Sequence, residues 1–114
     1  MLCRYFLNTE VNDMDIRALA EKHREYIIDR RRYYHQHPEL SFKEWETTKA
    51  PKADLEAMGL EIQTFEDYPG LVATLDTGKP GKTIMLRSDI DALPVEEGTG
   101  LPYASENQGV MHAC

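Results

Sequence analysis

The spacing of apolar residues predicts helices in the first half of the chain and strands in the second. Between residues 13 and 35, apolar side chains recur every three or four positions with charged residues between them, which is typical of an amphipathic helix. Asn12 or Asp13 is a suitable N-cap. Pro38 disfavours helical geometry at His37, so we expect this helix to end near His35.

A second helix is predicted after the segment SFKE at residues 41–44. Ser41 and Glu44 have the spacing of a capping box, in which each side chain accepts a hydrogen bond from a free amide of the first turn. Gly59 stands where a left-handed C-terminal cap is expected. Pro51 interrupts the helical pattern and deletes one hydrogen bond at a cost of about 3 kcal/mol, so we expect a kink or break near residues 47–50.

From residue 60 the pattern changes to alternation and to short apolar runs. Residues 60–65, 70–75 and 83–87 are predicted strands, and the glycines and proline of residues 76–82 indicate a turn. The last two strands are therefore expected to form an antiparallel hairpin. Residues 94–114 are predicted to be irregular. The fold class is α/β: two helices, a three-stranded β segment and a long irregular C-terminal stretch.

Composition and charge exclude several kinds of partner. The chain has 114 residues, which allows one domain or part of one. A net charge of -7 argues against nucleic acid and anionic membranes as partners, and no apolar run approaches the length of a membrane span. Cys3 and Cys114 lie at opposite ends without a disulfide spacing, which indicates a reducing, cytoplasmic location.

Two carboxylates follow directly after the apolar run that ends at Leu86. In an extended segment, Asp89 and Asp91 project from the same face, about 7 Å apart, so one can support a metal ligand while the other faces a site. Aspartates after a strand also commonly cap turns, and this alternative stays open.

Histidines, a carboxylate and a thiol suggest metal binding at two further places. His35, His37 and Glu39 lie within five residues, although such a cluster at a helix end also serves to terminate the helix. His112 and Cys114 are separated by one residue and would point the same way in a strand. A thiolate is a strong metal ligand, but a metal site needs three or four protein ligands. A small metal-binding protein using His35, His37, His112 and Cys114 is one hypothesis.

Three segments, taken in order, resemble the aminoacylase and carboxypeptidase family of dinuclear metallohydrolases. They are RRYYHQHPELSFKE at 31–44, LRSDIDALP at 86–94, and GLPYAS at 100–105 with MHAC at 111–114. The resemblance covers about residues 15–114 and is specific to the amidohydrolase branch. That branch includes hippurate hydrolases, N-acyl-amino-acid and N-acetyldiaminopimelate deacylases, and hydrolases of auxin conjugates.

The resemblance implies roles for individual residues. Cys114 would be the first metal ligand of a site with two ions, either Zn, Mn or Co, that activate a water and polarise an amide carbonyl. Asp91 would support a metal-binding side chain, and Asp89 would have a weaker catalytic role. His35, His37 and Glu39 would hold the first helix against the loops near the site.

The same resemblance sets the expected domain organisation. Residues 1–13 would be an unstructured or over-called extension with Met14 as the natural start, and residues 14–114 would be an incomplete N-terminal portion of a zinc-peptidase-like catalytic domain. The complete enzyme would cleave N-acyl amino acids or small peptides and could form homo-oligomers. We expect the isolated chain to be inactive, with metal absent or weakly bound. The alternative is a non-catalytic interaction module that pairs with a full-length relative.

Overall fold

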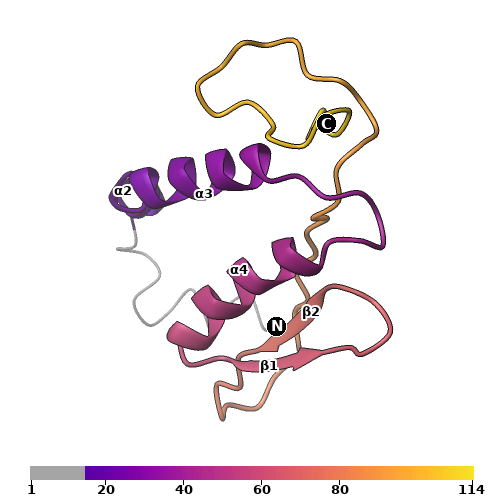
Figure 1. Cartoon of the computed structure of the whole chain (residues 1–114). Coiled ribbons are helices and arrows are strands. Elements are labelled where there is room, and N and C mark those ends of the chain that lie inside the picture. Colours follow the sequence, from indigo (N-terminus) through magenta and orange to yellow (C-terminus); the bar gives the residue numbers. More distant parts are fainter. Residues whose placement is uncertain (1–14) are drawn as a thin grey trace.

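The computed structural model describes residues 15–114, which contain three helices and a two-stranded sheet (Figure 1). The elements in chain order are α2 (Ile16–Lys22), α3 (Arg24–Gln36), α4 (Trp45–Ala57), β1 (Glu61–Thr64) and β2 (Leu71–Thr74). The predicted α/β class is confirmed. None of the helices in this part of the chain has the length and apolarity needed to cross a membrane.

The first predicted helix is divided into two. His23 adopts φ -98° and ψ 5°, which separates α2 from α3. Asp15 caps α2, because its carboxylate accepts a hydrogen bond from the Ala18 amide at 3.0 Å. The expected caps Asn12 and Asp13 lie outside the described residues. The end of α3 agrees closely with the prediction of an end near His35, since α3 ends at Gln36, two residues before Pro38.

The predicted capping box at the start of α4 is wrong. Phe42 has φ 63°, a left-handed conformation, and the helix begins only at Trp45, after Glu44. The free amide of Thr47 in the first turn instead donates to the Glu39 carboxylate at 2.6 Å. A carboxylate from the loop before the helix therefore performs the task that we assigned to Ser41.

Pro51 and Gly59 are the two residues in the second half of α4 and just after it for which we made predictions. We expected a kink or a break near Pro51. The helix continues from Trp45 to Ala57 with Pro51 inside it, so a break is wrong. A missing hydrogen bond of this kind is tolerated where packing offsets it, and α4 packs against both strands. Gly59 has φ 79°, and its amide donates to the Glu56 carbonyl while the Leu60 amide donates to the Leu55 carbonyl. These two bonds form the expected glycine cap.

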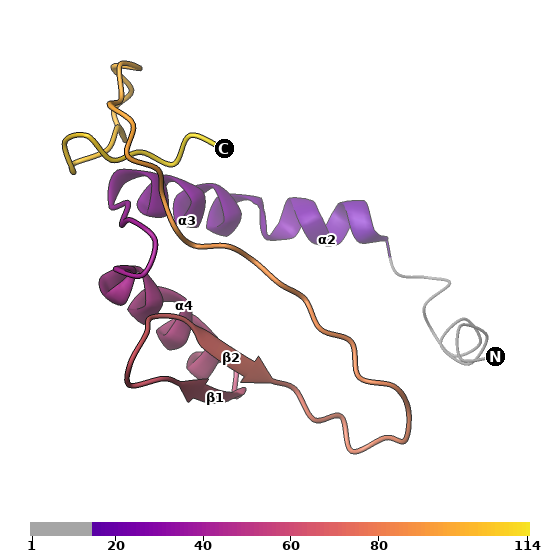
Figure 2. The ribbon, with the colours of Figure 1, turned by 90° about the vertical axis from the view of Figure 1, so that its right-hand side faces the viewer.

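The sheet pairs different segments from those predicted. β1 and β2 are antiparallel, with Glu61 opposite Thr74 and Thr64 opposite Leu71. The expected hairpin between residues 70–75 and 83–87 is wrong, because residues 83–87 are in no strand and belong to a long extended loop (Figure 2). The loop between β1 and β2 is held to α4 by a 2.9 Å bond from the Gly70 amide to Thr48 Oγ1, which favours the local pairing.

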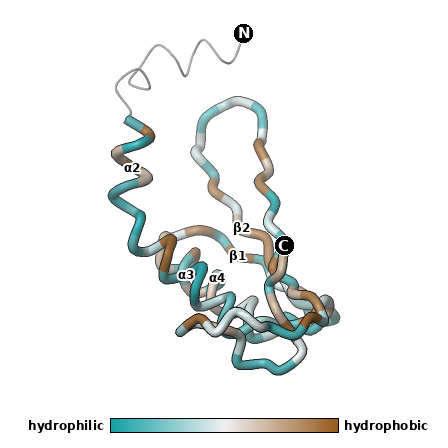
Figure 3. The backbone as a smooth tube through the Cα atoms, turned by 90° about the horizontal axis from the view of Figure 1, so that it is seen from above, coloured by the Kyte–Doolittle hydropathy of each residue, from teal (hydrophilic) through white to brown (hydrophobic). Residues whose placement is uncertain are grey.

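Few apolar side chains in residues 15–114 are fully enclosed. Ala92 and Pro38 are buried, whereas Ile84, Met85 and Leu86 are 84%, 86% and 93% exposed. Figure 3 shows hydrophobic positions on the extended loop that follows β2. Residues 94–114 are irregular, as predicted, and isolated bridges join Leu40 to Ala92 and Leu93 to Met111.

Candidate metal centre

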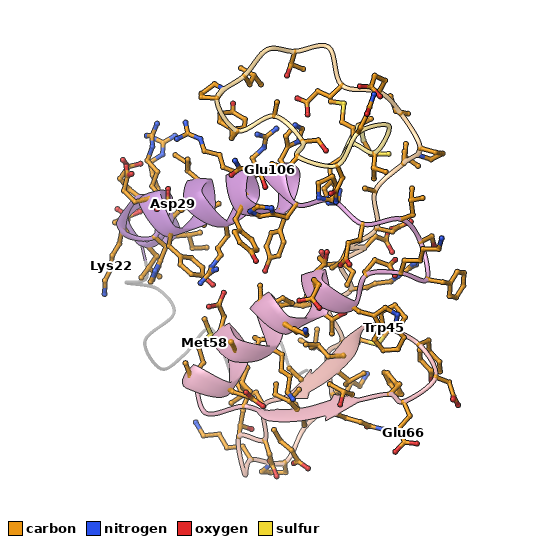
Figure 4. The ribbon with its side chains drawn as sticks, in the orientation of Figure 1. Lys22, Asp29, Trp45, Met58, Glu66 and Glu106 are labelled. Carbon is orange, nitrogen blue, oxygen red and sulfur yellow. The ribbon has the colours of Figure 1, made fainter. Side chains whose placement is uncertain are left out.

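The C-terminal segment lies against the C-terminal end of α3 (Figure 1). The Glu106 amide donates to the Gln36 carbonyl at 2.8 Å, and the Asn107 side-chain amide donates to the Pro38 carbonyl at 2.6 Å. Figure 4 shows Glu106 beside this end of the helix. The segment that carries His112 and Cys114 is thus attached to the motif that contains Pro38.

Two backbone bonds bring His112 toward the predicted aspartates. The amides of Leu93 and Met111 each donate to the other's carbonyl at 3.0 Å, so residues 111 and 112 run beside residues 92 and 93. The Ala92 amide donates to the Glu39 carbonyl at 2.8 Å. Three segments that are distant in sequence therefore meet at Ala92.

His112 has an unusual environment for an imidazole. Its Nε2 atom is buried and has no hydrogen-bond partner among the described residues. Burial lowers the pKa of His112, the nearby His35 lowers it further, and the carboxylate of Asp91 acts in the opposite direction. Burial thus favours the neutral form of the ring, which is the form that binds a metal.

The remaining predicted site residues are more exposed. Cys114 is a free, exposed thiol, and Asp91 is also exposed. Asp89 forms an ion pair with Arg87, with 2.7 Å between Oδ1 and Nη2, at a position open to solvent. Asp91 acts electrostatically on His112, whereas the ion pair of Asp89 is formed with its own neighbour in the chain.

His35, His37 and Glu39 each make a contact that ties segments together. His35 Nε2 lies 3.1 Å from Glu97 Oε1, His37 Nδ1 lies 3.4 Å from Glu106 Oε2, and the Glu39 carboxylate accepts the Thr47 amide. Within residues 15–114, no three histidine, cysteine or acidic side chains are grouped so that they could hold a metal ion. The hypothesis of a four-ligand site from His35, His37, His112 and Cys114 is therefore wrong.

Glu97 is a site residue that the sequence analysis missed. Its side chain is 5% exposed and accepts hydrogen bonds from the Ser105 amide at 2.6 Å, from the Thr99 hydroxyl and from His35. These bonds, with the Ser105 amide first, lower the pKa of Glu97 from 4.5 to about 2. No sequence pattern indicated this role, because His35 lies 62 positions earlier in the chain.

The donor chemistry fits a divalent metal ion, although the described residues do not complete a site. A thiolate, a neutral imidazole with a free Nε2 and a nearby carboxylate are side chains that zinc or cobalt accepts. A site requires three or four such ligands, and no group of three is assembled here. A thiolate and an imidazole in one loop of an α/β segment are compatible with part of a metal-dependent hydrolase.

Comparisons with known proteins agree with this class. Residues 85–114 match the model of peptidase family M20/M25/M40. The chain is 44% identical over 108 residues to an N-acetyl-L-cysteine deacetylase of Bacillus subtilis, covering 95% of this chain and 25% of that protein. It is 46% identical over 101 residues to thermostable carboxypeptidase 1 of Saccharolobus solfataricus, covering 88% and 25%.

Two solved structures are similar to this chain in both fold and sequence. A dinuclear metal binding peptidase from the M20 family of Bacillus subtilis superposes with a TM-score of 0.76 at 43% identity, covering 82% of this chain and 27% of that one. A putative aminohydrolase from methicillin-resistant Staphylococcus aureus gives 0.80 at 47% identity, covering 85% and 26%. The resemblance to this family that the three motifs predicted is therefore confirmed. The chain spans about a quarter of the length of these relatives.

Proposed function

We propose that this chain is part of the catalytic domain of a metal-dependent amidohydrolase that cleaves N-acyl amino acids or small peptides. The observation that carries the proposal is the free Cys114 thiol two residues after His112, whose buried Nε2 has no partner among the described residues, in the segment that matches the peptidase family. The names of the relatives, two of which are an N-acetyl-L-cysteine deacetylase and an N-acetyldiaminopimelate deacetylase, support the substrate class.

Cys114 is the proposed metal ligand within this chain. Its thiolate would bind one of two divalent ions, either Zn, Mn or Co, and the bound ions would lower the pKa of a water and polarise the amide carbonyl. Asp91 is the proposed supporting carboxylate, because it lies close enough to His112 to oppose the fall in its pKa. Asp89 has a weaker supporting role, since Arg87 already pairs with it.

The 114-residue chain alone is proposed to be inactive. Cys114 is exposed, and no two other metal-binding side chains among residues 15–114 are grouped with it. A single thiolate leaves most coordination positions of a metal ion to water, so we expect weak metal binding. Domain boundaries at residues 1–13 and 14–114 and a cytoplasmic location remain predictions.

A chimaera tests the proposal. Residues 1–114 would replace the matching segment of the Bacillus subtilis N-acetyl-L-cysteine deacetylase, which is 44% identical over 108 residues. We expect the purified chimaera to bind metal and to hydrolyse N-acetyl-L-cysteine, and Cys114→Ser to lose metal and activity. Asp91→Asn should reduce activity by roughly 10-fold to 100-fold, as expected for a residue that supports a metal ligand.

The matched control is Cys3→Ser, which changes the other cysteine by the same substitution. It should leave metal content and rate unchanged. Full metal content and full activity in the Cys114→Ser chimaera would refute the metal role. Hydrolysis of N-acetyl or N-benzoyl amino acids by the pure 114-residue chain, abolished by Cys114→Ser, would refute the proposed inactivity.

A non-catalytic interaction module is the second candidate function. The extended loop favours it, because Ile84, Met85 and Leu86 are almost fully exposed and together form an apolar run that a partner could cover. Co-purification with a full-length relative, combined with an unchanged catalytic rate of that relative, would support this candidate over the first.

A further inference from the structure

The side chain of Glu97 joins two parts of the C-terminal segment to α3. Oε1 lies 3.1 Å from His35 Nε2 and also accepts the Thr99 hydroxyl, while Oε2 accepts the Ser105 amide at 2.6 Å. His35 and Glu97 side chains are 6% and 5% exposed. Both carboxylate oxygens are thus engaged in a site from which water is largely excluded.

Tyr103, which follows Glu97 in the same loop, also packs against α3. The Tyr103 ring packs edge-on against His35, with 6.0 Å between ring centroids. The guanidinium groups of Arg31 and Arg32 lie 5.8 and 5.0 Å from the Tyr103 ring centroid. Residues 97–105 are therefore held against the C-terminal part of α3 by a buried hydrogen bond and two cation–π contacts.

Residues 106–111 make further contacts between the segment held by Glu97 and Cys114. Directly after Ser105, Glu106 bonds the Gln36 backbone, and Asn107 bonds the Pro38 carbonyl. Met111 is then paired with Leu93, three residues before Cys114. No helix or strand stiffens residues 97–114, so their position depends on these side-chain and backbone contacts.

We propose that Glu97 is a positioning residue for Cys114: its bonds to His35, Thr99 and Ser105 fix the course of residues 97–114 and so present the thiol in one orientation. This inference rests on the proposed metal role of Cys114. A glutamine at this position would keep the size of the side chain but replace one acceptor oxygen by a donor. One of the three groups that donate to Glu97 would then face another donor.

The test is ¹⁵N NMR and amide hydrogen exchange on the full 114-residue chain without metal, comparing Glu97→Gln with the unchanged protein. We expect the Ser105 amide to exchange at least about tenfold faster, as follows from losing a hydrogen bond to a charged group. The signals of Met111, His112 and Cys114 should also shift, while those of α4, β1 and β2 remain unchanged. Glu96→Gln, at the exposed neighbouring position, is the matched control and should change none of these.

Two further variants keep the inference testable if Glu97→Gln unfolds the chain. His35→Gln places an amide donor near the position of Nε2 and should preserve the signals of residues 111–114, whereas His35→Ala should shift them. A mere packing role for the imidazole predicts equal shifts in both variants and would overturn the inference.

Two further outcomes would contradict the positioning role of Glu97. An unprotected Ser105 amide in the unchanged chain, or unmoved signals for residues 111–114 in Glu97→Gln, would contradict the positioning role. Since this measurement contains no metal, such a result is distinct from failure of the metal role, which the Cys114→Ser chimaera tests separately.

Discussion

Buried polar side chains form much of the close packing around the end of α3 and the start of α4. His35, Glu44, Thr47 and Thr48 are all less than a tenth exposed. Thr48 shows how such a residue is used, because its hydroxyl donates to the Glu44 carbonyl at 2.6 Å and accepts the Gly70 amide at 2.9 Å. Hydrogen bonds of this kind require specific partners, so they define local geometry more narrowly than apolar contacts do.

The Glu97 carboxylate gives a pH prediction at this scale. Its pKa falls from 4.5 to about 2 in the folded chain, so its ionised form stabilises the fold. That contribution is complete above pH 4.5 and is lost as the pH falls toward 2. We expect ¹³C NMR of the side-chain carboxyl to show Glu97 titrating well below pH 4.5. A midpoint at or above pH 4.5 would contradict the hydrogen bonds that this carboxylate accepts.

At the scale of elements, the two ends of α4 are stabilised in different ways. The start depends on Glu39, which lies eight residues before Thr47. The Glu39 carboxylate accepts the Thr47 amide and so replaces the local capping box. The other end is local: Gly59 takes a left-handed conformation, and two backbone bonds satisfy the last carbonyls. Only the local end could be recognised from adjacent residues.

The left-handed conformation of Gly59 predicts how Gly59→Ala, which adds one methyl group, changes the stability of the chain. A Cβ at Gly59 would meet no atom within 4 Å, but φ is 79°, so Gly59→Ala should lower the free energy of unfolding by about 1–2 kcal/mol through backbone strain alone. Urea unfolding followed by circular dichroism measures this. Gly98→Ala is the control, because Gly98 has equally open space without a left-handed φ. Equal stabilities of the two variants would refute the strain argument.

At the scale of the whole molecule, much apolar surface in residues 15–114 is uncovered. Ile84, Met85 and Leu86 are consecutive and exposed, and β2 is paired only with β1 in the two-stranded sheet. An exposed apolar run and an open strand edge each favour association with another chain.

We therefore expect the chain to self-associate as its concentration rises, and the double substitution Ile84→Thr with Leu86→Thr to reduce this. Sedimentation velocity over a range of concentrations provides the measurement. The control pair, Thr83→Ser with Ser88→Thr, flanks the run and leaves its apolar side chains in place. If both pairs of substitutions behave alike, the run is not the associating surface.

The features of the fold that depend on neighbouring residues in the chain were the ones that the sequence predicted correctly. Pro38 correctly placed the end of α3 and Gly59 the end of α4. Alternation indicated the segment of β1, and a short apolar run indicated that of β2. The partner of β2 and the cap of α4 were predicted wrongly, because each depends on a contact with a residue outside the local pattern. The role of Glu97 was not predicted at all, since its partners His35 and Ser105 have no spacing relation to it that a pattern could reveal.

The sequence by itself determined the α/β class, the family relationship through three ordered motifs, and Cys114 and Asp91 as candidates for metal chemistry. These follow from residue type and spacing, which are local properties of the chain. Only the tertiary structure decided that His35 pairs with Glu97, that residues 94–114 lie across the end of α3, and that His112 keeps an unpartnered Nε2. Burial and distance produce these features, and both depend on how remote segments pack together.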